Sequence, residues 1–315
     1  MPLPLLIVNP KSASGSTREN WTEMASEFRT HFGPFQVSFT KAPGHAIELA
    51  RDAALDGRRF LIACGGDGTI NEVANGILES GEDVELGVLP SGTGGDFRRT
   101  LELPSSTLAT AAALKTGETK RMDVGRVTLT GLDGRPICRY FLNVSSVGLA
   151  PAVIKRVKSA KAFDWLPVET LRGKANFAFS TLQEIVGAES MLVRVGIDTD
   201  ETTPLQTISL CIANSRFFGG GMKIAPDAKL DDGLLDVINV GDLSKARIFL
   251  NAHTLYRGTH ASMAEVRSKK AKRVRIEPSD NLQEVLLETD GEILGKLPAL
   301  YEIVPSALKI RVPAK

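Results

Sequence analysis

The sequence has few cysteines, and they are isolated from one another. Only three occur in 315 residues, Cys64, Cys138 and Cys211, and each lies in an apolar stretch. No CxxC pair is present, so neither a disulfide framework nor a metal site of that kind is predicted. Buried free thiols are typical of a reducing compartment, and we therefore expect a cytoplasmic protein.

Long apolar runs and an excess of one charge are also absent. No run approaches the roughly 20 residues that a helix needs to cross a bilayer, and Met1–Pro10 lacks the basic start and apolar length of a signal peptide. The 38 Lys and Arg residues are balanced by 37 Asp and Glu residues, giving a net charge of +1. We expect no nucleic-acid partner, and contact with an anionic surface would depend on local patches.

What remains is the composition of an ordinary globular protein. Hydrophobic residues make up 43% of the chain and charged residues 24%. A chain of 315 residues is long enough for two domains, each with a core of its own.

In the first half, short apolar strands alternate with helical patterns. This alternation predicts a parallel sheet that is covered by helices on both faces. One helix is predicted up to about Thr30 and an alanine-rich one at His45–Leu55. The strands are predicted at Leu3–Val8, Gln36–Thr40, Phe60–Cys64 and Val84–Leu89.

A glycine turn, Gly65–Gly68, joins the third strand to the helix that follows. Thr69 and Glu72 have the spacing of a capping box, which predicts that this helix begins directly after the glycines. Its free N–H groups would then point into a loop suited to phosphate, and Asp67 would add a carboxylate for a metal or a reacting hydroxyl. The alternative is an ordinary tight turn of an α/β protein.

A second glycine-rich loop, Ser91–Asp96, follows the fourth strand. Loops after parallel strands meet at one edge of the sheet, so we expect four loops to converge there. Neither glycine loop has the Walker spacing or the GxGxxG dinucleotide pattern. The converging loops are Asn9–Gly15, Thr40–Gly44, Gly65–Thr69 and Ser91–Asp96.

The second half has a different pattern, which predicts a mainly antiparallel sheet with inserted helices. Leu132–Arg135 carries an Asp-Gly hairpin signal. A hinge near Gly125 would leave a cleft between the halves. Helices are expected at Leu171–Ile185 and Leu243–Tyr256. Strands are expected at Val127–Leu129, Ile137–Val144, Leu192–Ile197, Leu205–Ala213, Leu234–Val240, Val274–Ile276 and Val285–Leu287.

Two motifs carry a resemblance to a known family. GGDGTINEVANG at Gly65–Gly76 and LPSGTGGDFRRT at Leu89–Thr100 closely resemble the two signatures of the diacylglycerol kinase catalytic-domain family, which includes bacterial lipid kinases and the sphingosine and ceramide kinases. One position departs from the pattern, since Gly95 stands where the family more often has Asn. Further matches lie at Val8–Gly15, Thr40–Ala46, Ala225–Val237 and Thr289–Glu292.

The resemblance implies an α/β nucleotide-binding domain, of the kind found in NAD kinases and phosphofructokinases, followed by an antiparallel β-sandwich. We expect the first domain at residues 1–125, with a strand near 302–315 returning to it, and a lipid-substrate domain at 126–301. ATP would be the cofactor. Its expected contacts are Asn9, Thr40, Gly65, Gly66, Asp67, Gly68, Thr69, Ile70, Asn71, Gly92 and Thr93.

The resemblance also implies a metal site and a proton acceptor. Lys229 and Leu234 would offer carbonyl oxygens to Mg²⁺ and Asp232 its carboxylate, while Glu292 would accept the hydroxyl proton with Asp290 beside it. On the residues alone, Asp231–Gly233 and Asp290-Gly291 are more simply interpreted as hairpin turns.

Two basic segments bear on membrane contact. Lys155–Lys161, with Phe163 and Trp165 close behind, joins charge to aromatic rings that favour the lipid–water boundary, although Trp165 fits a core equally well. Arg267–Arg275 is more simply a solvated approach to a strand than a lipid-binding patch.

These features together predict a kinase, a transferase of phospholipid biosynthesis that uses ATP and Mg²⁺ to phosphorylate diacylglycerol or a related lipid such as phosphatidylglycerol or a sphingoid base. We expect a cytoplasmic protein in peripheral contact with the membrane that holds its lipid substrate, and a homodimer remains open. The alternatives are a soluble-substrate kinase of the NAD kinase type, because GGDGT occurs there too, and a binding protein without catalysis.

Overall fold

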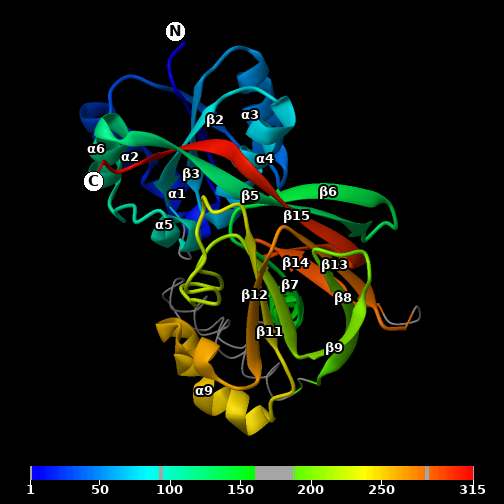
Figure 1. The fold of residues 1–315 in the computed structure, drawn as a ribbon. Coiled ribbons are helices and arrows are strands. Elements are labelled where there is room, and N and C mark those ends of the chain that lie inside the picture. The colour runs from blue at the N-terminus through cyan, green and yellow to red at the C-terminus, as the bar shows by residue number, and fades with distance from the viewer. Residues whose placement is uncertain (1, 92–94, 160–186, 188, 281–283, 315) are drawn as a thin grey trace. The chain divides into compact units, whose positions relative to one another are not determined.

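The chain folds into two compact units. The computed structural model describes residues 2–91, 95–159, 187, 189–280 and 284–314, which Figure 1 draws as coloured ribbon. Unit 1 comprises Met1–Val124 and Pro305–Lys315, and unit 2 comprises Gly125–Val304. Two strands, β5 (Glu118–Gly131) and β15 (Glu292–Val312), contribute residues to both units.

Unit 1 contains a parallel sheet with the strand order β2-β1-β3-β4-β15. Its last member is the end of β15, where Lys309 and Ile310 pair in parallel with Glu85 and Leu86 of β4. The other four strands are β1 (Leu5–Val8), β2 (Gln36–Phe39), β3 (Phe60–Gly65) and β4 (Glu85–Pro90).

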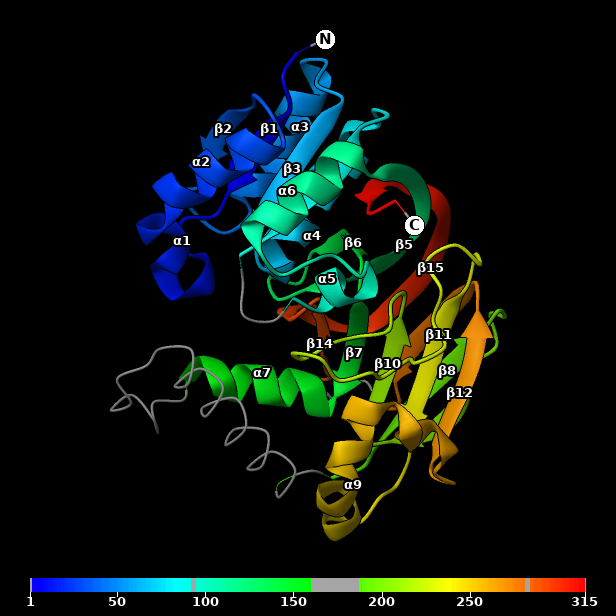
Figure 2. The same ribbon diagram turned by 90° about the vertical axis from the view of Figure 1, so that its left-hand side faces the viewer.

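Helices cover the sheet of unit 1. α2 packs against α6, and α3 packs against α4. Figure 2 shows α2 and α6 lying over one face of the sheet. The helical segments are η1 (Ser12–Gly15), α1 (Ser16–Glu19), α2 (Trp21–His31), α3 (His45–Leu55), α4 (Asp67–Ser80), α5 (Asp96–Thr100) and α6 (Thr107–Thr116).

Strand side chains of unit 1 are buried on both faces of the sheet. Alternate residues of β1 and β3 pack with Phe28 of α2 and Leu114 of α6 in one cluster. The residues between them, such as Ile7 and Leu61, are also fully buried. Burial on both faces explains why these strands are apolar throughout, as expected for a covered parallel sheet.

Unit 2 is built from antiparallel strands. One layer has the order β12-β11-β10-β7-β14-β15, and β15 also pairs with β13 and β5, which lead to β8, β9 and β6. The strands are β6 (Pro136–Phe141), β7 (Val144–Gly148), β8 (Met191–Ile197), β9 (Thr203–Thr207), β10 (Ser209–Ala213), β11 (Leu235–Val240), β12 (Val266–Ala271), β13 (Arg273–Pro278) and β14 (Leu286–Thr289).

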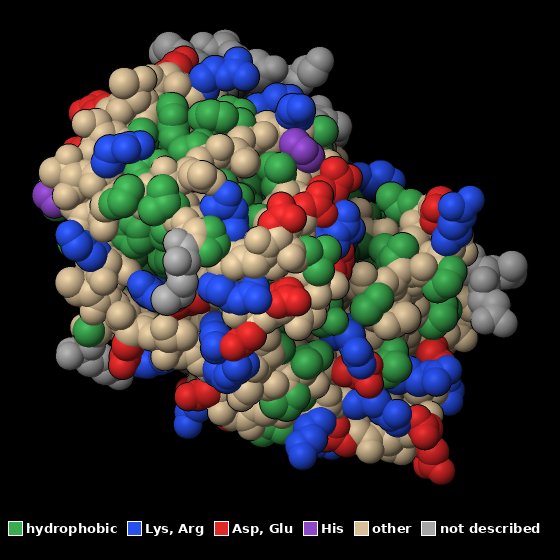
Figure 3. Space-filling view, turned by 90° about the horizontal axis from the view of Figure 1, so that it is seen from above, with side chains coloured by type: hydrophobic (Ala, Val, Ile, Leu, Met, Phe, Trp, Pro, Cys, Tyr) green, Lys and Arg blue, Asp and Glu red, His purple; other side chains and the backbone are tan. Residues whose placement is uncertain are grey.

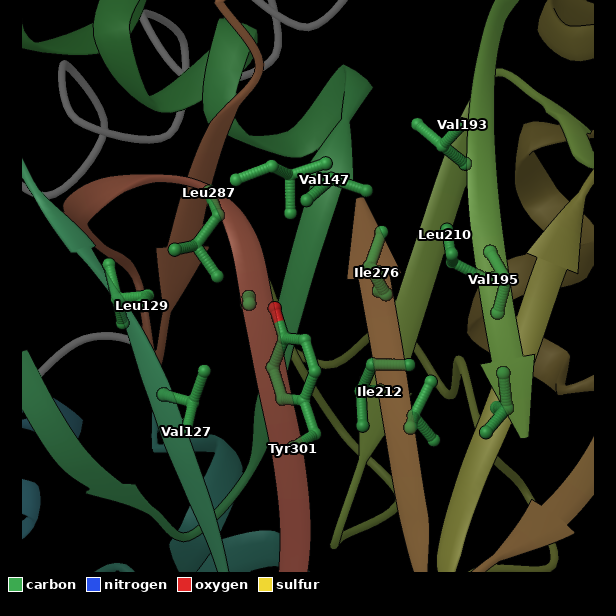
Figure 4. Close-up of a cluster of buried hydrophobic side chains, with 14 of the residues drawn as sticks. Val127, Leu129, Val147, Val193, Val195, Leu210, Ile212, Ile276, Leu287 and Tyr301 are labelled. Carbon is green, nitrogen blue, oxygen red and sulfur yellow. The ribbon is translucent and has the colours of Figure 1, made fainter. Parts of the chain in front are cut away.

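The core of unit 2 lies between two layers of strands. Figure 4 shows Val147, Leu210 and Ile212 from one layer packed with side chains from β5, β8, β13 and β15. Tyr301 is fully buried in this cluster, and its hydroxyl lies 3.2 Å from the Ser145 hydroxyl. Two facing sheets with a shared apolar interior form a β-sandwich. The predicted fold class, a parallel α/β domain with a mainly antiparallel β-sandwich, is therefore confirmed.

The helical segments of unit 2 in the described part are α7 (Leu149–Ser159), α9 (Lys245–Arg257) and η2 (Thr259–Ser262). α9 confirms the helix predicted at Leu243–Tyr256. The helix predicted at Leu171–Ile185, and the membrane candidate from residue 160 onward with Phe163 and Trp165, lie outside the described residues. None of the helices that the structure describes is long and apolar enough to cross a membrane.

Strand predictions in unit 2 were wrong in detail at three places. The segment Ile137–Val144 is not one strand, because β6 ends at Phe141 and β7 begins at Val144. The segment Leu205–Ala213 forms two strands, because the chain changes pairing partner at Ile208: β9 pairs with β8, whereas β10 pairs with β7 and β11. The basic run Arg267–Arg275 is not an approach to a strand but forms most of β12 and the start of β13.

Charges of both signs are mixed on the surface. On the face drawn in Figure 3, Lys and Arg side chains alternate with Asp and Glu side chains. This mixture agrees with the nearly equal numbers of basic and acidic residues, 38 and 37.

Candidate functional site

The loops that follow β1, β3 and β4 contact one another at the carboxyl edge of the unit 1 sheet. The Asn9 amide nitrogen donates to the Thr69 hydroxyl at 3.1 Å, which connects the first loop to the start of α4. The Ser12 and Ser91 hydroxyls lie 3.0 Å apart, which connects the first loop to the end of β4. Three of the four loops expected to converge are therefore brought together by side-chain hydrogen bonds.

The glycine turn leads directly into α4, which begins at Asp67. The N-cap residue is Gly66, which provides no side-chain cap. Helix geometry leaves the first N–H groups of α4 without intrahelical acceptors, so they are available to an anion. Gly65 cannot be replaced without strain, because a Cβ there would lie 2.5 Å from the Thr69 Cβ. This close approach explains the glycine at the end of β3.

The predicted capping box was wrong. α4 begins two residues before Thr69, which is buried inside its first turn and accepts the Asn9 hydrogen bond. Glu72 instead caps another helix, since its two carboxylate oxygens accept from the N–H groups of Gly44 and Ala46 at 2.9 and 3.1 Å. The carboxylate thus satisfies free donors at the start of α3, where the helix dipole favours negative charge.

The Asp67 carboxylate connects the two glycine-rich loops. One oxygen accepts from the Asp96 N–H at 3.0 Å and the other from the Phe97 N–H, also at 3.0 Å. Asp67 therefore caps α5. Asp96 itself is buried and pairs with Arg99 at 3.0 Å. Both Asp67 oxygens thus bind the first turn of α5.

The other predicted nucleotide contacts are in varied surroundings. Thr40 follows β2 and donates its N–H to Val8 at 2.9 Å. The Ile70 side chain is 1% exposed and belongs to the core, so only its backbone is near the turn. Asn71 accepts from the Asn75 amide at 3.0 Å. Gly92 and Thr93 lie outside the described residues.

In unit 2, Asp290 supports a chain reversal. Its carboxylate accepts three backbone N–H groups, from Leu142 at 2.8 Å, Asn143 at 2.9 Å and Val144 at 3.0 Å. Asp290 and Gly291 have φ angles of 47° and 87°, the left-handed values of a two-residue hairpin turn between β14 and β15. The turn interpretation made from the residues alone is thus observed, and the carboxylate ties this turn to the start of β7.

Glu292 directly follows the turn. It is the first residue of β15, is paired across the hairpin with Thr289, and is exposed. The turn thus sets the direction in which the Glu292 carboxylate leaves the sheet. Its position is compatible with contact to a bound hydroxyl, whereas the Asp290 carboxylate is engaged with the backbone.

Glu288, a buried carboxyl on the same hairpin, belongs to none of the motifs that the sequence shows. Its side chain is 2% exposed and accepts hydrogen bonds from the Ser146 hydroxyl and, at 2.9 Å, from the Gly291 N–H. Burial, opposed by these two hydrogen bonds and reinforced by the nearby Asp290 charge, raises the pKa of Glu288 to about 7. The available signal was an acid directly after the apolar run Val285–Leu287. At 2% exposure this carboxyl cannot itself touch a substrate.

Both carboxylate oxygens of Asp232, the one side-chain ligand of the predicted Mg²⁺ site, accept hydrogen bonds from protein groups. One Asp232 oxygen accepts from the Leu234 N–H at 3.1 Å, and the other binds the Lys270 ammonium at 2.6 Å. The same ammonium lies 3.3 Å from a carboxylate oxygen of Asp236. Lys229 is exposed, and no cluster of three metal-binding side chains occurs among the described residues. The cation that contacts the Asp232 carboxylate in this structure is the Lys270 ammonium.

Comparison with known families accounts for nearly the whole chain. The model of the diacylglycerol kinase catalytic domain matches residues 4–127. The model of the YegS C-terminal NAD kinase beta sandwich-like domain matches residues 151–312.

Relatives of similar length occur in several bacteria. The chain is 30% identical over 276 residues to a diacylglycerol kinase of Staphylococcus epidermidis, covering 85% of this chain and 81% of that protein. It is 27% identical over 297 residues to a diacylglycerol kinase of Bacillus subtilis, covering 94% and 91%. It is also 27% identical over 310 residues to one of Mycobacterium tuberculosis, covering 98% and 94%.

Solved structures share the fold. A candidate diacylglycerol kinase of Bacillus anthracis str. Sterne matches with a TM-score of 0.75 and 25% identity, covering 98% of this chain and 95% of that one. A second crystal structure from that strain matches with a TM-score of 0.71 and 22% identity, over 98% and 96%.

Proposed function

The chain belongs to the diacylglycerol kinase catalytic-domain family, and on this premise we propose that it is a lipid kinase that transfers the γ-phosphate of ATP to the hydroxyl of diacylglycerol or a related lipid. The observation that carries the proposal is the junction of glycine-rich loops in unit 1, held by the Asp67 carboxylate and by the Asn9–Thr69 hydrogen bond.

The proposed phosphate site uses backbone donors. The N–H groups at the start of α4 face the glycine turn, where the helix N-terminus favours negative charge. Asp67 contributes indirectly, because its carboxylate holds the start of α5 beside the start of α4. Fixed donors are the main requirement of phosphoryl transfer, since most of the catalysis comes from positioning and charge stabilisation.

We propose Glu292 as the proton acceptor for the lipid hydroxyl. It is an exposed residue directly after the two-residue turn, whereas the neighbouring Asp290 carboxylate accepts three backbone N–H groups and holds the turn in place. The hydroxyl would attack in line with the leaving diphosphate and pass its proton to Glu292. Mg²⁺ enters the proposal as part of the nucleotide substrate, and Asp232 takes no part in it.

The test is transfer of labelled γ-phosphate from ATP to diacylglycerol, phosphatidylglycerol, ceramide and sphingosine in mixed micelles, with NAD as a soluble acceptor. We expect label in a single lipid. Glu292→Gln should lose roughly a hundredfold or more of this transfer while ATP binding persists. Asp67→Asn should weaken both, because an amide cannot accept from both N–H groups.

Glu284→Gln is the matched control, since Glu284 is an exposed acid of unit 2 whose carboxylate forms an ion pair with Lys296. Label in NAD alone would show that the chain is a soluble-substrate kinase. ATP binding without transfer to any acceptor would indicate a protein that binds without catalysis. A Glu292→Gln variant as active as the wild type would remove Glu292 as the proton acceptor.

A further inference from the structure

The helix α9 exposes large hydrophobic side chains on its outward face. Phe249, Leu250 and Tyr256 are 58%, 67% and 53% exposed, and they are three of the nine large hydrophobic residues that the described part of the chain exposes. Phe249 and Tyr256 are seven residues apart and lie on one line of the helix, whereas Leu250 lies about 100° round the helix from Phe249. All three are on the exposed side of α9 and together form a broad exposed stripe. Figures 1 and 2 show α9 at the periphery of unit 2.

The inward face of α9 already accounts for its packing on unit 2. Leu255 packs against the buried cluster that contains Ile224 and Val266, and Ile248 and Ala252 on the same side are half-buried. The stripe on the opposite side therefore adds nothing to the core. A surface helix that is apolar on both sides indicates a partner for its second side.

The charge of α9 indicates what kind of partner it is. Its sequence, KARIFLNAHTLYR, contains three Lys or Arg residues and one His, and no acid. Arg257 adjoins Tyr256 at the end of the exposed stripe, while Arg247 pairs with Glu265. Positive charge beside exposed aliphatic and aromatic side chains matches the boundary between anionic headgroups and acyl chains, where Tyr and Arg are favoured.

We propose that the outward face of α9 docks this chain on an anionic phospholipid bilayer, with Phe249 and Leu250 entering the acyl boundary and Arg257 facing lipid phosphates. The inference rests on the proposed function, because a kinase whose acceptor is a lipid must reach a lipid phase. One short helix with three apolar side chains supports weak, reversible binding, which suits an enzyme that leaves the surface after each encounter.

The test is co-sedimentation of the full chain with vesicles, without ATP or acceptor lipid. Vesicles of phosphatidylcholine are compared with vesicles containing 30% phosphatidylglycerol, a composition chosen for the assay. We expect binding to the anionic vesicles, a loss of at least tenfold in Leu250→Glu, and a smaller loss in Arg257→Glu. Leu132→Ala is the matched control, because Leu132 is 64% exposed on a turn elsewhere in unit 2 and its removal should leave binding unchanged.

Phosphorylation of a short-chain, water-soluble diacylglycerol separates this inference from the proposed function. We expect Leu250→Glu to retain this activity at the wild-type rate, which also shows that the variant is folded. Wild-type vesicle binding by both α9 variants would overturn the docking surface even if the kinase is active. A wild-type dimer that Leu250→Glu converts to a monomer, with vesicle binding unchanged, would assign the face to a second copy of this chain.

Discussion

Glu288 is a carboxyl whose charge conflicts with its surroundings. It lies in β14 beside the fully buried Tyr301 and Cys211, and the Asp290 carboxylate adds repulsion. The hydrogen bonds from Ser146 and Gly291 only partly offset the cost of removing the ion from water. Glu288 lies on the same hairpin as Glu292, so its ionisation makes the stability of this hairpin depend on pH.

We expect Glu288→Gln to remove a pH dependence of stability. In the unfolded chain this carboxyl ionises near pH 4.5, but in the folded chain only near pH 7, so the free energy of unfolding falls as pH rises between these values. The total loss is roughly 3 kcal/mol at about 1.36 kcal/mol per pKa unit. Urea unfolding of both proteins from pH 5 to pH 8 measures it, with Glu284→Gln as a control. Parallel pH profiles for wild type and Glu288→Gln would contradict this assignment.

Lys270 binds the carboxylate of Asp232, which the family resemblance assigns to a metal ion. Its ammonium bridges the Asp232 carboxylate and that of Asp236, which is 4% exposed. Lys270→Met should destabilise the protein by about 1–3 kcal/mol, because it leaves a buried carboxylate beside a second one without a cation. We further expect millimolar Mg²⁺ to raise the melting temperature of this variant in the absence of nucleotide, and to have little effect on the wild type.

Lys269→Met is the control for this prediction, since Lys269 is an exposed neighbour on the same strand. Thermal unfolding with and without Mg²⁺ measures the effect. A wild-type response to Mg²⁺ that disappears in Asp232→Asn would show that the ion displaces Lys270 and that the site predicted from the sequence is a metal site after all.

At the scale of single residues, the sequence indicates which residues have a special role better than it indicates which residues they contact. The glycine-rich motifs correctly mark Gly65 and Asp67 as special. The spacing along the chain, however, pairs Thr69 with Glu72. In the fold, Thr69 is bound by Asn9, and Glu72 is bound by N–H groups at the start of α3. Gly95 shows the converse. Its φ of 63° lies in the left-handed region that Gly and Asn tolerate best, which explains how Gly can stand where the family more often has Asn.

The contact between α3 and α4 depends on a glycine inside a helix. A Cβ at Gly76 would lie 2.3 Å from the Ile47 carbonyl oxygen and 2.7 Å from the Ala50 Cβ. The two helices thus pack closely enough to exclude any side chain at this position. Because α3 is also held by Glu72 of α4, this contact fixes the pair of helices behind the glycine turn.

We therefore expect Gly76→Ala to destabilise the protein although alanine favours helices. The steric cost of overpacking is about 1–3 kcal/mol, against roughly 1 kcal/mol gained in helix propensity. Glu79→Ala on the exposed side of the same helix should change stability by less than about 0.5 kcal/mol. Chemical unfolding of the two variants gives the comparison. A Gly76→Ala protein more stable than the wild type would show that the helices can separate at no cost.

Elements with a clear hydrophobic period were predictable, and changes of pairing partner were not. The helix His45–Leu55 has the predicted bounds because its alanine-rich face is buried against α4. The break at Ile208 left no clear signal, since neither glycine nor proline marks the bend at which the chain moves from one layer of the sandwich to the other. The buried faces of a strand show in its sequence, but its neighbours do not.

Across the whole molecule, a late segment of the chain completes the first unit. Leu308 and Ile310 are each 1% exposed in unit 1, and Arg311 binds Glu85 and lies with its guanidinium 4.4 Å from the centre of the Phe60 ring. Removal of residues 305–315 should cost at least about 3 kcal/mol, because two large apolar side chains lose their burial.

Hydrogen exchange measures which strands lose stability when residues 305–315 are removed. We expect amide protection to decrease in β4 and β3 and to persist in β10 and β11 of unit 2, because the sandwich keeps the earlier part of β15. Removal of residues 314–315 alone is the control and should leave β4 protected. Equal loss of protection in both units would show that they unfold as one.

The parallel sheet of unit 1 was predictable from apolar strands that alternate with helices, and the antiparallel strands of unit 2 from short strands with turn signals. The arrangement of those antiparallel strands as a sandwich was expected from the family resemblance. The return of β15 to unit 1 was expected from the family resemblance and not from the residues, since a terminal apolar strand carries no mark of the sheet that it joins.

The pairing of β15 with β4 has a consequence for the newly made chain. Glu85 and Arg311 are separated by 226 positions, so the sheet of unit 1 lacks its edge strand until nearly all of unit 2 has been synthesised. At about 5–20 residues per second the ribosome needs roughly 10 to 45 seconds for this stretch. During that interval β4 presents an open edge, a template for aggregation that chaperones would be expected to cover.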